Sequence, residues 1–165
     1  MAVLIWLPLL LPSLLAALGF GLRRRRWTMW LPIAAAAVVL LAGIALLVAV
    51  QGSGAVVTGA GLLRADPLSA WLLSVVGAVA VISLWGGLPE PGTEERAGGV
   101  HAALLCLFLA AMTLAVTADN LGLMWVAIEL TTITTAFLVA SGGGRNALEA
   151  AWKYVVLGAV GVAIA

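Results

Sequence analysis

Apolar residues occur along this chain in six long runs, separated by short stretches that are polar or rich in glycine. Each run is about 20 residues long, the length that an α-helix needs to cross a hydrocarbon layer of roughly 30 Å. The runs are continuous, whereas the strands of a membrane barrel alternate apolar and polar residues over about 10 positions. We therefore predict an all-α, polytopic transmembrane helix bundle that forms a single domain. Its six spans are expected at about residues 2–22, 30–50, 67–87, 100–118, 121–140 and 148–165.

The stretches between the runs differ in character. Residues 51–66 are rich in glycine and long enough to hold a short hairpin, and residues 88–99 form a charged turn rich in proline and glycine. Between the fourth and fifth runs only two residues are clearly polar, one of them Asp119, which predicts a tight antiparallel pair of helices. Asp66 directly precedes Pro67, the pattern of an N-cap followed by the first residue of a helix.

Composition supports membrane insertion and narrows the function. The chain has 165 residues, of which 64% are hydrophobic and only 9% are charged, and its mean hydropathy is +1.21. A soluble domain has roughly 25% charged residues. No basic face interleaved with aromatic residues is present to bind nucleic acid. The single cysteine, Cys106, cannot form an internal disulfide or a cysteine-based metal cluster. The sequence has none of the motifs for nucleotide, metal, haem or acyl chemistry, so we expect no cofactor and no metal.

Positive charge predicts the orientation in the membrane. Four consecutive arginines, residues 23–26, follow the first run and no positive charge precedes it, which is the reverse of a secretory signal peptide. If the N-terminus is outside, the inner loops contain these arginines with Arg96 and Arg145, while the outer loops contain only Arg64. We therefore expect a retained first span in the cell inner (cytoplasmic) membrane. The last run reaches Ala165 without a polar flank, so we also expect this chain to be a piece of a longer protein.

Glu129 is the most informative residue because it lies well inside the fifth run, near the expected bilayer midplane. A charge at that depth costs about 2.5–3.5 kcal/mol on insertion scales, so it persists only with a partner or a function. A carboxyl group balanced between desolvation and a nearby cation can take up and release a proton near neutral pH. Thr132, three residues further on, shares its side of the helix. The alternative is that Glu129 only holds helices together through a buried hydrogen bond.

Other ionisable residues lie near the ends of the runs. Arg145, Glu149 and Lys153 are spaced by four residues and therefore share one helical face. Lys153 is either a cation at the inner part of a proton path or an anchor whose ammonium group reaches the headgroups. His101 titrates in a useful range, although a single histidine at the interface is more often polar filler. Asp119 is expected to be a residue of an outer turn.

Three segments resemble a known family. The run FLAAMTLAVTADNLGLMWVAIELTTITTAFLVA, followed by ALEAAWKYVVLGAVGVAIA, is similar to the antiporter-like subunits of respiratory complex I and of Mrp cation/proton antiporters. Within that superfamily it resembles the component F type of hydrogenase-4 and formate hydrogenlyase-like complexes. The earlier segment LRADPLSAWLL resembles the start of the family's third helix. The resemblance covers about residues 62–165, and the first two runs match only in hydropathy and orientation.

The resemblance implies a fourteen-helix fold of which this chain is the N-terminal part. It implies that Glu129 is the family's fifth-helix glutamate, a proposed proton relay, and that Lys153 matches a lysine near the start of the sixth helix. The family's main lysine partner for this glutamate lies on the seventh helix, beyond these 165 residues. We therefore predict a membrane subunit that conducts H⁺ or Na⁺ within a redox-driven complex of hydrogenase or NADH–quinone oxidoreductase type. Its partners would be the other membrane subunits and the lipid bilayer, and it would not itself catalyse redox chemistry.

Two other functions remain open from the sequence. In a structural membrane anchor, Glu129→Gln would impair assembly of the complex and leave proton pumping unchanged. A small cation/proton exporter would exchange protons for a cationic drug, but such exporters have fewer helices and place their glutamate in the first span. Proton release on adding substrate to the purified chain would identify an exporter.

Overall fold

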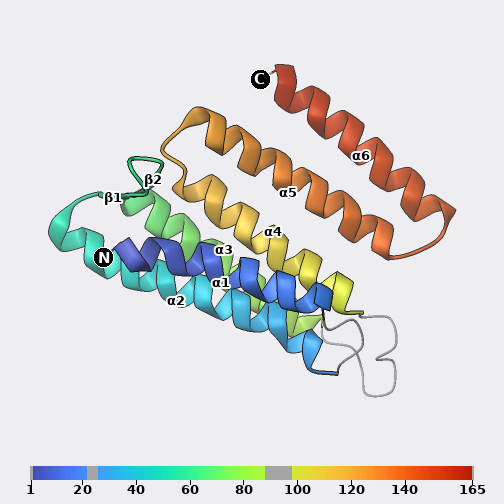
Figure 1. Ribbon diagram of the computed structural model, residues 1–165, viewed down its shortest axis with the longest axis horizontal. Coiled ribbons are helices and arrows are strands. Elements are labelled where there is room, and N and C mark those ends of the chain that lie inside the picture. The colour runs from blue at the N-terminus through green and yellow to red at the C-terminus, as the bar shows by residue number, and fades with distance from the viewer. Residues whose placement is uncertain (1, 22–25, 88–97, 165) are drawn as a thin grey trace.

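The computed structural model describes residues 2–21, 26–87 and 98–164, and within them it contains six long helices and one short hairpin (Figure 1). The predicted class, an all-α polytopic bundle of six spans, is confirmed, because all six α-helices are long and apolar enough to cross a membrane. The predictions for residues 23–26 and 88–99 fall almost entirely outside the described residues. In chain order the elements are α1 (Ala2–Gly21), the 3-10 helix η1 (Arg26–Met29), α2 (Trp30–Ser53), β1 (Val56–Thr58), β2 (Leu63–Ala65), α3 (Pro67–Gly86), α4 (Gly99–Thr117), α5 (Leu121–Ser141) and α6 (Arg145–Ile164).

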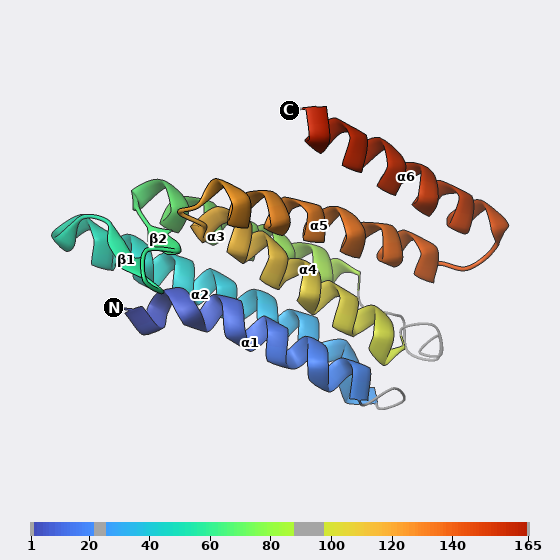
Figure 2. The ribbon, with the colours of Figure 1, turned by 45° about the horizontal axis from the view of Figure 1, so that its top comes forward.

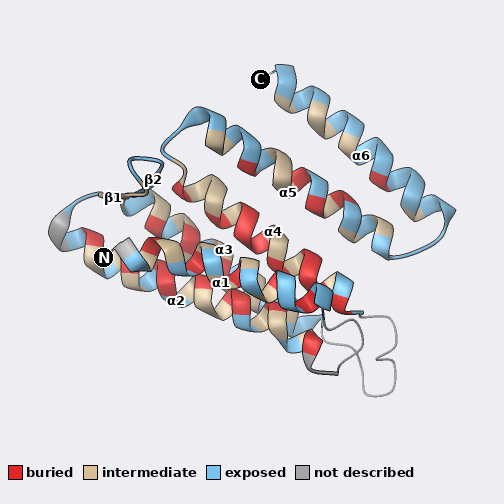
Figure 3. Ribbon diagram, in the orientation of Figure 1, coloured by how far each residue is buried: buried red, intermediate tan, exposed pale blue. Residues whose placement is uncertain are grey.

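The helices form a four-helix core with two further helices on one side. Helices α1 to α4 pack together, and α2–α3 and α1–α4 are the most extensive pairs. Helix α5 lies along α4, and α6 lies along α5, which Figure 2 shows from a second direction. Buried residues concentrate in α1 to α4, whereas Ala151 is the one buried residue of α6 among those described (Figure 3). Helix α6 is therefore an outer helix that presents most of its surface to its surroundings.

Helices α2 and α3 approach each other closely because glycines lie at their contact. A Cβ atom at Gly43 would lie 2.6 Å from the backbone nitrogen of Ser74, and one at Gly77 would collide with the backbone of Leu40. Between membrane helices, association depends on such close packing, because lipid tails are as apolar as the side chains that they would replace. The two glycines therefore fix the separation of this helix pair.

Helix ends follow the local backbone chemistry. Helix α6 begins at Arg145, three residues before the expected start, because Gly143 and Gly144 close the preceding turn with φ angles of +78° and +89°. Only glycine adopts such angles at little cost. Helix α2 continues to Ser53, three residues beyond the expected end, and stops where Gly54 takes a φ of +73°.

The glycine-rich connection between α2 and α3 forms the predicted hairpin. Strands β1 and β2 are antiparallel and pair Thr58 with Leu63. Residues 59–62 make the turn, the first three of them have positive φ, and Ala60 has a φ of +56°. That conformation costs a residue other than glycine roughly 1–2 kcal/mol. The surrounding contacts must supply this energy for the hairpin to keep its shape.

Helix α3 begins at the predicted N-cap. The Asp66 Oδ1 atom accepts a hydrogen bond from the Ser69 N–H at 2.7 Å, and Pro67 occupies the first helical position. This hydrogen bond lowers the pKa of the Asp66 carboxyl group below its usual value, because it stabilises the carboxylate. Asp66 therefore fixes the hairpin and α3 relative to each other.

Candidate functional site

Glu129 lies in the middle of α5, between Leu121 at one end and Ser141 at the other. At 1.5 Å per residue, its Cα is roughly 12 Å from the first end and 18 Å from the second. The side chain is half-buried. Within residues 2–21, 26–87 and 98–164, no hydrogen bond or ion pair reaches its carboxyl group. Glu129 is thus a carboxyl group deep in a spanning helix with no partner in the described part of the chain.

The side of α5 that carries Glu129 also carries its contact with α6. Thr132, one turn further on, is buried, and a Cβ atom at Gly158 of α6 would lie 2.7 Å from its Cγ2 atom. Because α5 and α6 are antiparallel, Gly161 lies at about the level of Glu129. A Cβ atom at Gly161 would meet nothing within 4 Å. The space beside Gly161 is therefore open among the described residues, at about the level of Glu129.

The hydroxyl groups of α5 all bond to carbonyl oxygens of their own helix. Thr132 donates to the Ile128 oxygen at 3.2 Å, and Thr135 donates to the Thr131 oxygen at 2.8 Å. Thr134 donates to the Leu130 oxygen at 2.8 Å in the same way. Such bonds occupy the hydroxyl proton and leave the oxygen able to accept another hydrogen bond. The threonines therefore need no partner from another helix, unlike Glu129.

Lys153 lies on a different face of α6 from the contact with α5. Its ammonium group is 2.5 Å from the Glu149 carboxylate, and the two side chains are 54% and 57% exposed. Ala151, the buried residue of α6, lies two positions earlier, which at 100° per residue places Lys153 on nearly the opposite side of the helix. The predicted Glu149–Lys153 pair is therefore present, but the structure does not bring Lys153 to Glu129.

His101 joins the start of α4 to the end of α5. Its Nδ1 atom lies 2.9 Å from the Ser141 hydroxyl oxygen, which itself donates to the Leu138 carbonyl oxygen at 2.7 Å. Which of the two groups donates in this contact depends on the tautomer of the histidine ring. His101 therefore has a side-chain partner at the end of α5, and it lies on the α4 side of α5 rather than beside Glu129.

Asp119 is a turn residue between α4 and α5, as expected, and it also has an ionic partner. One carboxylate oxygen lies 3.9 Å from the Arg64 guanidinium group on β2. Its backbone N–H donates to the Leu62 carbonyl oxygen at 2.9 Å. Asp119 therefore connects the hairpin to the start of α5.

The candidate residues lie in four places rather than in one site. Glu129 and Thr132 lie together at the α5–α6 contact, whereas the other three groups, around Lys153, His101 and Asp119, are separate from it. Sequence reasoning did not identify Ser141 as the partner of His101. The two residues are 40 positions apart, and nothing in the local pattern of either segment indicates the contact.

No family model matches the chain. Over 54 residues the chain is 48% identical to a hydrogenase-4 component F homolog of Methylacidiphilum infernorum (isolate V4), and the match covers 33% of this chain and 11% of that protein. In the structure of the membrane-bound sulfane sulfur reductase, an archaeal respiratory membrane complex, one chain superposes with a TM-score of 0.76 and 21% identity. That match covers 98% of this chain and 34% of the solved chain.

The two matches cover different lengths of this chain and of the proteins that it resembles. This chain spans about a third of the solved chain, and its matched segment spans about a tenth of the curated relative. The structural match at 21% identity shows the fold alone, and the sequence match shows a similarity over 54 residues. The chain is a multi-pass membrane protein, and its predicted resemblance to the component F type of hydrogenase-4 is confirmed over these 54 residues.

Proposed function

We propose that this chain is a membrane subunit that conducts protons across the membrane within a redox-driven respiratory or hydrogenase complex, with Glu129 as a relay group. The observation that carries the proposal is a carboxyl group in the middle of a spanning helix that has no hydrogen-bond or ionic partner among the described residues. The similarity to a hydrogenase-4 component F homolog and to a chain of an archaeal respiratory membrane complex supports it.

The proposed chemistry follows from the two charge states of one carboxyl group. Protonated Glu129 is neutral and is tolerated at its depth, whereas the carboxylate needs a cation or water beside it. A cation on a further helix, which the resemblance places on the seventh, would favour release of the proton, and its withdrawal would favour uptake. Redox chemistry in a partner subunit would move that cation or its proton, and this chain would supply the relay.

We propose an orientation with the N-terminus and the hairpin outside and the α5–α6 turn inside. The support is the sequence distribution of arginine, because inner loops carry the excess of positive charge. In this orientation Lys153 lies toward the inner side, where its ammonium group would provide a second relay group held by Glu149. If Lys153 only anchors the helix, Lys153→Arg will conduct normally. If it transfers protons, Lys153→Arg will lose transport, because a guanidinium group does not release its proton.

The test is proton pumping by the complete complex in vesicles, with Glu129→Gln compared with Thr131→Val. Glutamine keeps the shape of glutamate and cannot carry the proton. Thr131 is on the same helix, and its hydroxyl group bonds only within that helix, so its replacement controls for a changed side chain at similar depth. We expect Glu129→Gln to abolish pumping by this subunit and Thr131→Val to retain it. Repeating the assay with a sodium ionophore would separate H⁺ from Na⁺ transport.

A structural anchor is the second candidate, and the largely exposed surface of α6 favours it. An anchor needs contacts with other subunits and does not need a titratable group at Glu129. Normal pumping in Glu129→Gln, with less of the complex assembled, would establish the anchor and contradict the relay.

A further inference from the structure

The connection between α2 and α3 is longer than the distance between the two helices requires. Helices α2 and α3 are in close contact, and helix pairs of this kind are usually joined by about 2–8 residues. Residues 54–66 instead form a hairpin that extends to the turn between α4 and α5 (Figure 1). The hairpin also keeps Ala60 in a left-handed conformation. This extra length and strain indicate a role beyond joining two neighbouring helices.

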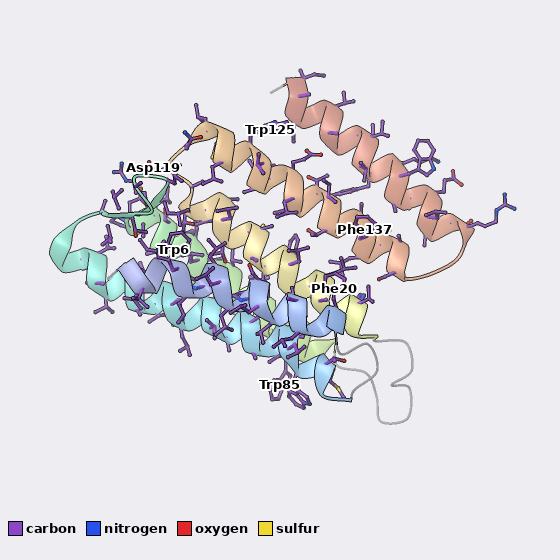
Figure 4. The ribbon with its side chains drawn as sticks, viewed as in Figure 1. Trp6, Phe20, Trp85, Asp119, Trp125 and Phe137 are labelled. Carbon is purple, nitrogen blue, oxygen red and sulfur yellow. The ribbon has the colours of Figure 1, made fainter. Side chains whose placement is uncertain are left out.

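The hairpin contacts the α4–α5 turn through a backbone bridge, with its hydrogen bond, and through an ion pair. Leu63 pairs with Ala118 in an antiparallel bridge, and the Asp119 N–H donates to the Leu62 carbonyl oxygen at 2.9 Å. The Arg64 guanidinium group lies 3.9 Å from the Asp119 carboxylate. Figure 4 shows Asp119 beside the hairpin. We call this bridge and this ion pair the hairpin clamp.

The hairpin is itself held by the core. Leu63 is 2% exposed and packs in the same buried cluster as Ile5 of α1. The Trp6 indole N–H donates to the Thr58 hydroxyl group at 3.3 Å, and the ring of Trp6 lies against the hairpin turn at Gly59. The clamp therefore ties the α4–α5 turn to α1 through a rigid element.

The clamp acts on the first turn of α5. Asp119 is followed by Asn120, the N-cap, whose side-chain oxygen accepts hydrogen bonds from the N–H groups of Gly122 and Leu123 at 2.9 and 3.2 Å. A helix is continuous from this cap, so a displacement of its first turn carries along the helix to Glu129, roughly 12 Å away. The other end of α5 is held by the Ser141 contact with His101.

We propose that the hairpin clamp is a positioning device that sets the height and rotation of Glu129 beside α6, with Leu63 and Asp119 as its positioning residues. The inference rests on the proposed relay function of Glu129. It makes the hairpin part of the conduction machinery, although among the described residues no hydrogen bond or ion pair joins the hairpin to Glu129.

The experiment breaks the clamp and then restores it covalently, in the complete complex. Asp119→Pro removes both the N–H group and the carboxylate, and Asp119→Asn, the matched control, keeps the N–H group. The restoring pair is Leu63→Cys with Ala118→Cys in a Cys106→Ala background. Residues directly opposite in an antiparallel pair have Cα atoms roughly 4.5–5.5 Å apart, within reach of a disulfide.

Transport per assembled complex is measured against pH. We expect Asp119→Pro to shift the pH profile of transport by roughly half a pH unit or more. Asp119→Asn should shift the profile less. In the Asp119→Pro variant, the oxidised cysteine pair should return the profile to that of the parent. Reduction of the disulfide should restore the shift. An unchanged profile in Asp119→Pro with less assembled complex would reduce the clamp to a structural connection and overturn the proposal, as would failure of the cysteines to cross-link. If Asp119→Pro does not assemble, Arg64→Ala should shift the pH profile by a smaller amount in the same direction. A pH profile in Arg64→Ala that equals the parental one would overturn the proposal.

Infrared spectroscopy separates failure of the clamp from failure of the relay. The carboxyl band of Glu129 is assigned by its loss in Glu129→Gln, and its position is then compared in Asp119→Pro and in the parent. If Glu129→Gln pumps normally but Asp119→Pro moves the band, the relay function is wrong and the clamp still positions the residue. If the band does not move, the clamp proposal is wrong whatever Glu129 does.

Discussion

Adding one methyl group to α2 should measure how closely α2 and α3 are packed. In Gly43→Ala the new Cβ atom would lie 2.6 Å from the Ser74 nitrogen and 2.9 Å from the Ser74 Cα, against the 3.4–4 Å of an ordinary contact. The obstructing atoms belong to the backbone, so no side-chain rotation relieves the collision, and the helices must separate by about 0.8 Å. Overpacking of this kind costs roughly 1–3 kcal/mol.

Gly161→Ala is the matched control. It makes the same change within a helix, at a position where a Cβ atom meets nothing within 4 Å. Alanine there should stabilise the helix by roughly 0.5–1 kcal/mol relative to glycine. The two variants should therefore differ in their free energy of unfolding by roughly 1.5–4 kcal/mol. The quantity is measured by titrating the purified chain in mixed micelles with a denaturing detergent. Equal stability of Gly43→Ala and Gly161→Ala would refute the contact between α2 and α3.

Three further predictions concern single contacts. Asp66→Ala should cost roughly 0.5–2 kcal/mol of stability at pH 7. Because the folded pKa of Asp66 is lowered, this difference from the parent should be full above about pH 4 and disappear as the pH falls through the folded pKa, which unfolding at several pH values will show. Gly158→Ala should destabilise the α5–α6 contact, and Thr132→Ser, which removes the obstructing methyl group, should restore stability in the double variant. Ser141→Ala should raise the amide hydrogen exchange of the last turn of α5, with no change if the His101 contact is absent.

The positions of the helices could be predicted because run length alone determines them. The hairpin and the N-cap were predictable as well, since glycine content and the Asp-Pro pair are local signals. The faces of the helices could not be predicted. In α2, Leu41 is 65% exposed and Leu46 is fully buried, although the same residue type occupies both positions. A helix that is apolar on all sides carries no pattern that distinguishes lipid from protein.

The surroundings of individual glycines could not be predicted from the sequence either. Gly43 lies against a backbone and Gly161 faces open space, and no feature of the sequence distinguishes them. The partners of His101 and Asp119 could not be predicted, because each partner lies on an element that is far away in the sequence. Sequence reasoning therefore identified the ionisable residues but not how they group.

Glu129 differs from every other polar residue of α5 in what its own helix can offer. A threonine in a helix donates its proton to a carbonyl oxygen one turn earlier, as Thr132 does to Ile128. A carboxylate has no proton to donate and needs N–H or O–H donors, and the backbone N–H groups in the middle of a helix are already bonded to carbonyl oxygens four residues before them. Among the described residues, neither the Trp125 indole N–H nor the Thr132 hydroxyl group of α5 bonds to this carboxylate. Its charge must be met by a proton, by water or by a cation from another element, and these are the exchanges from which a relay is built.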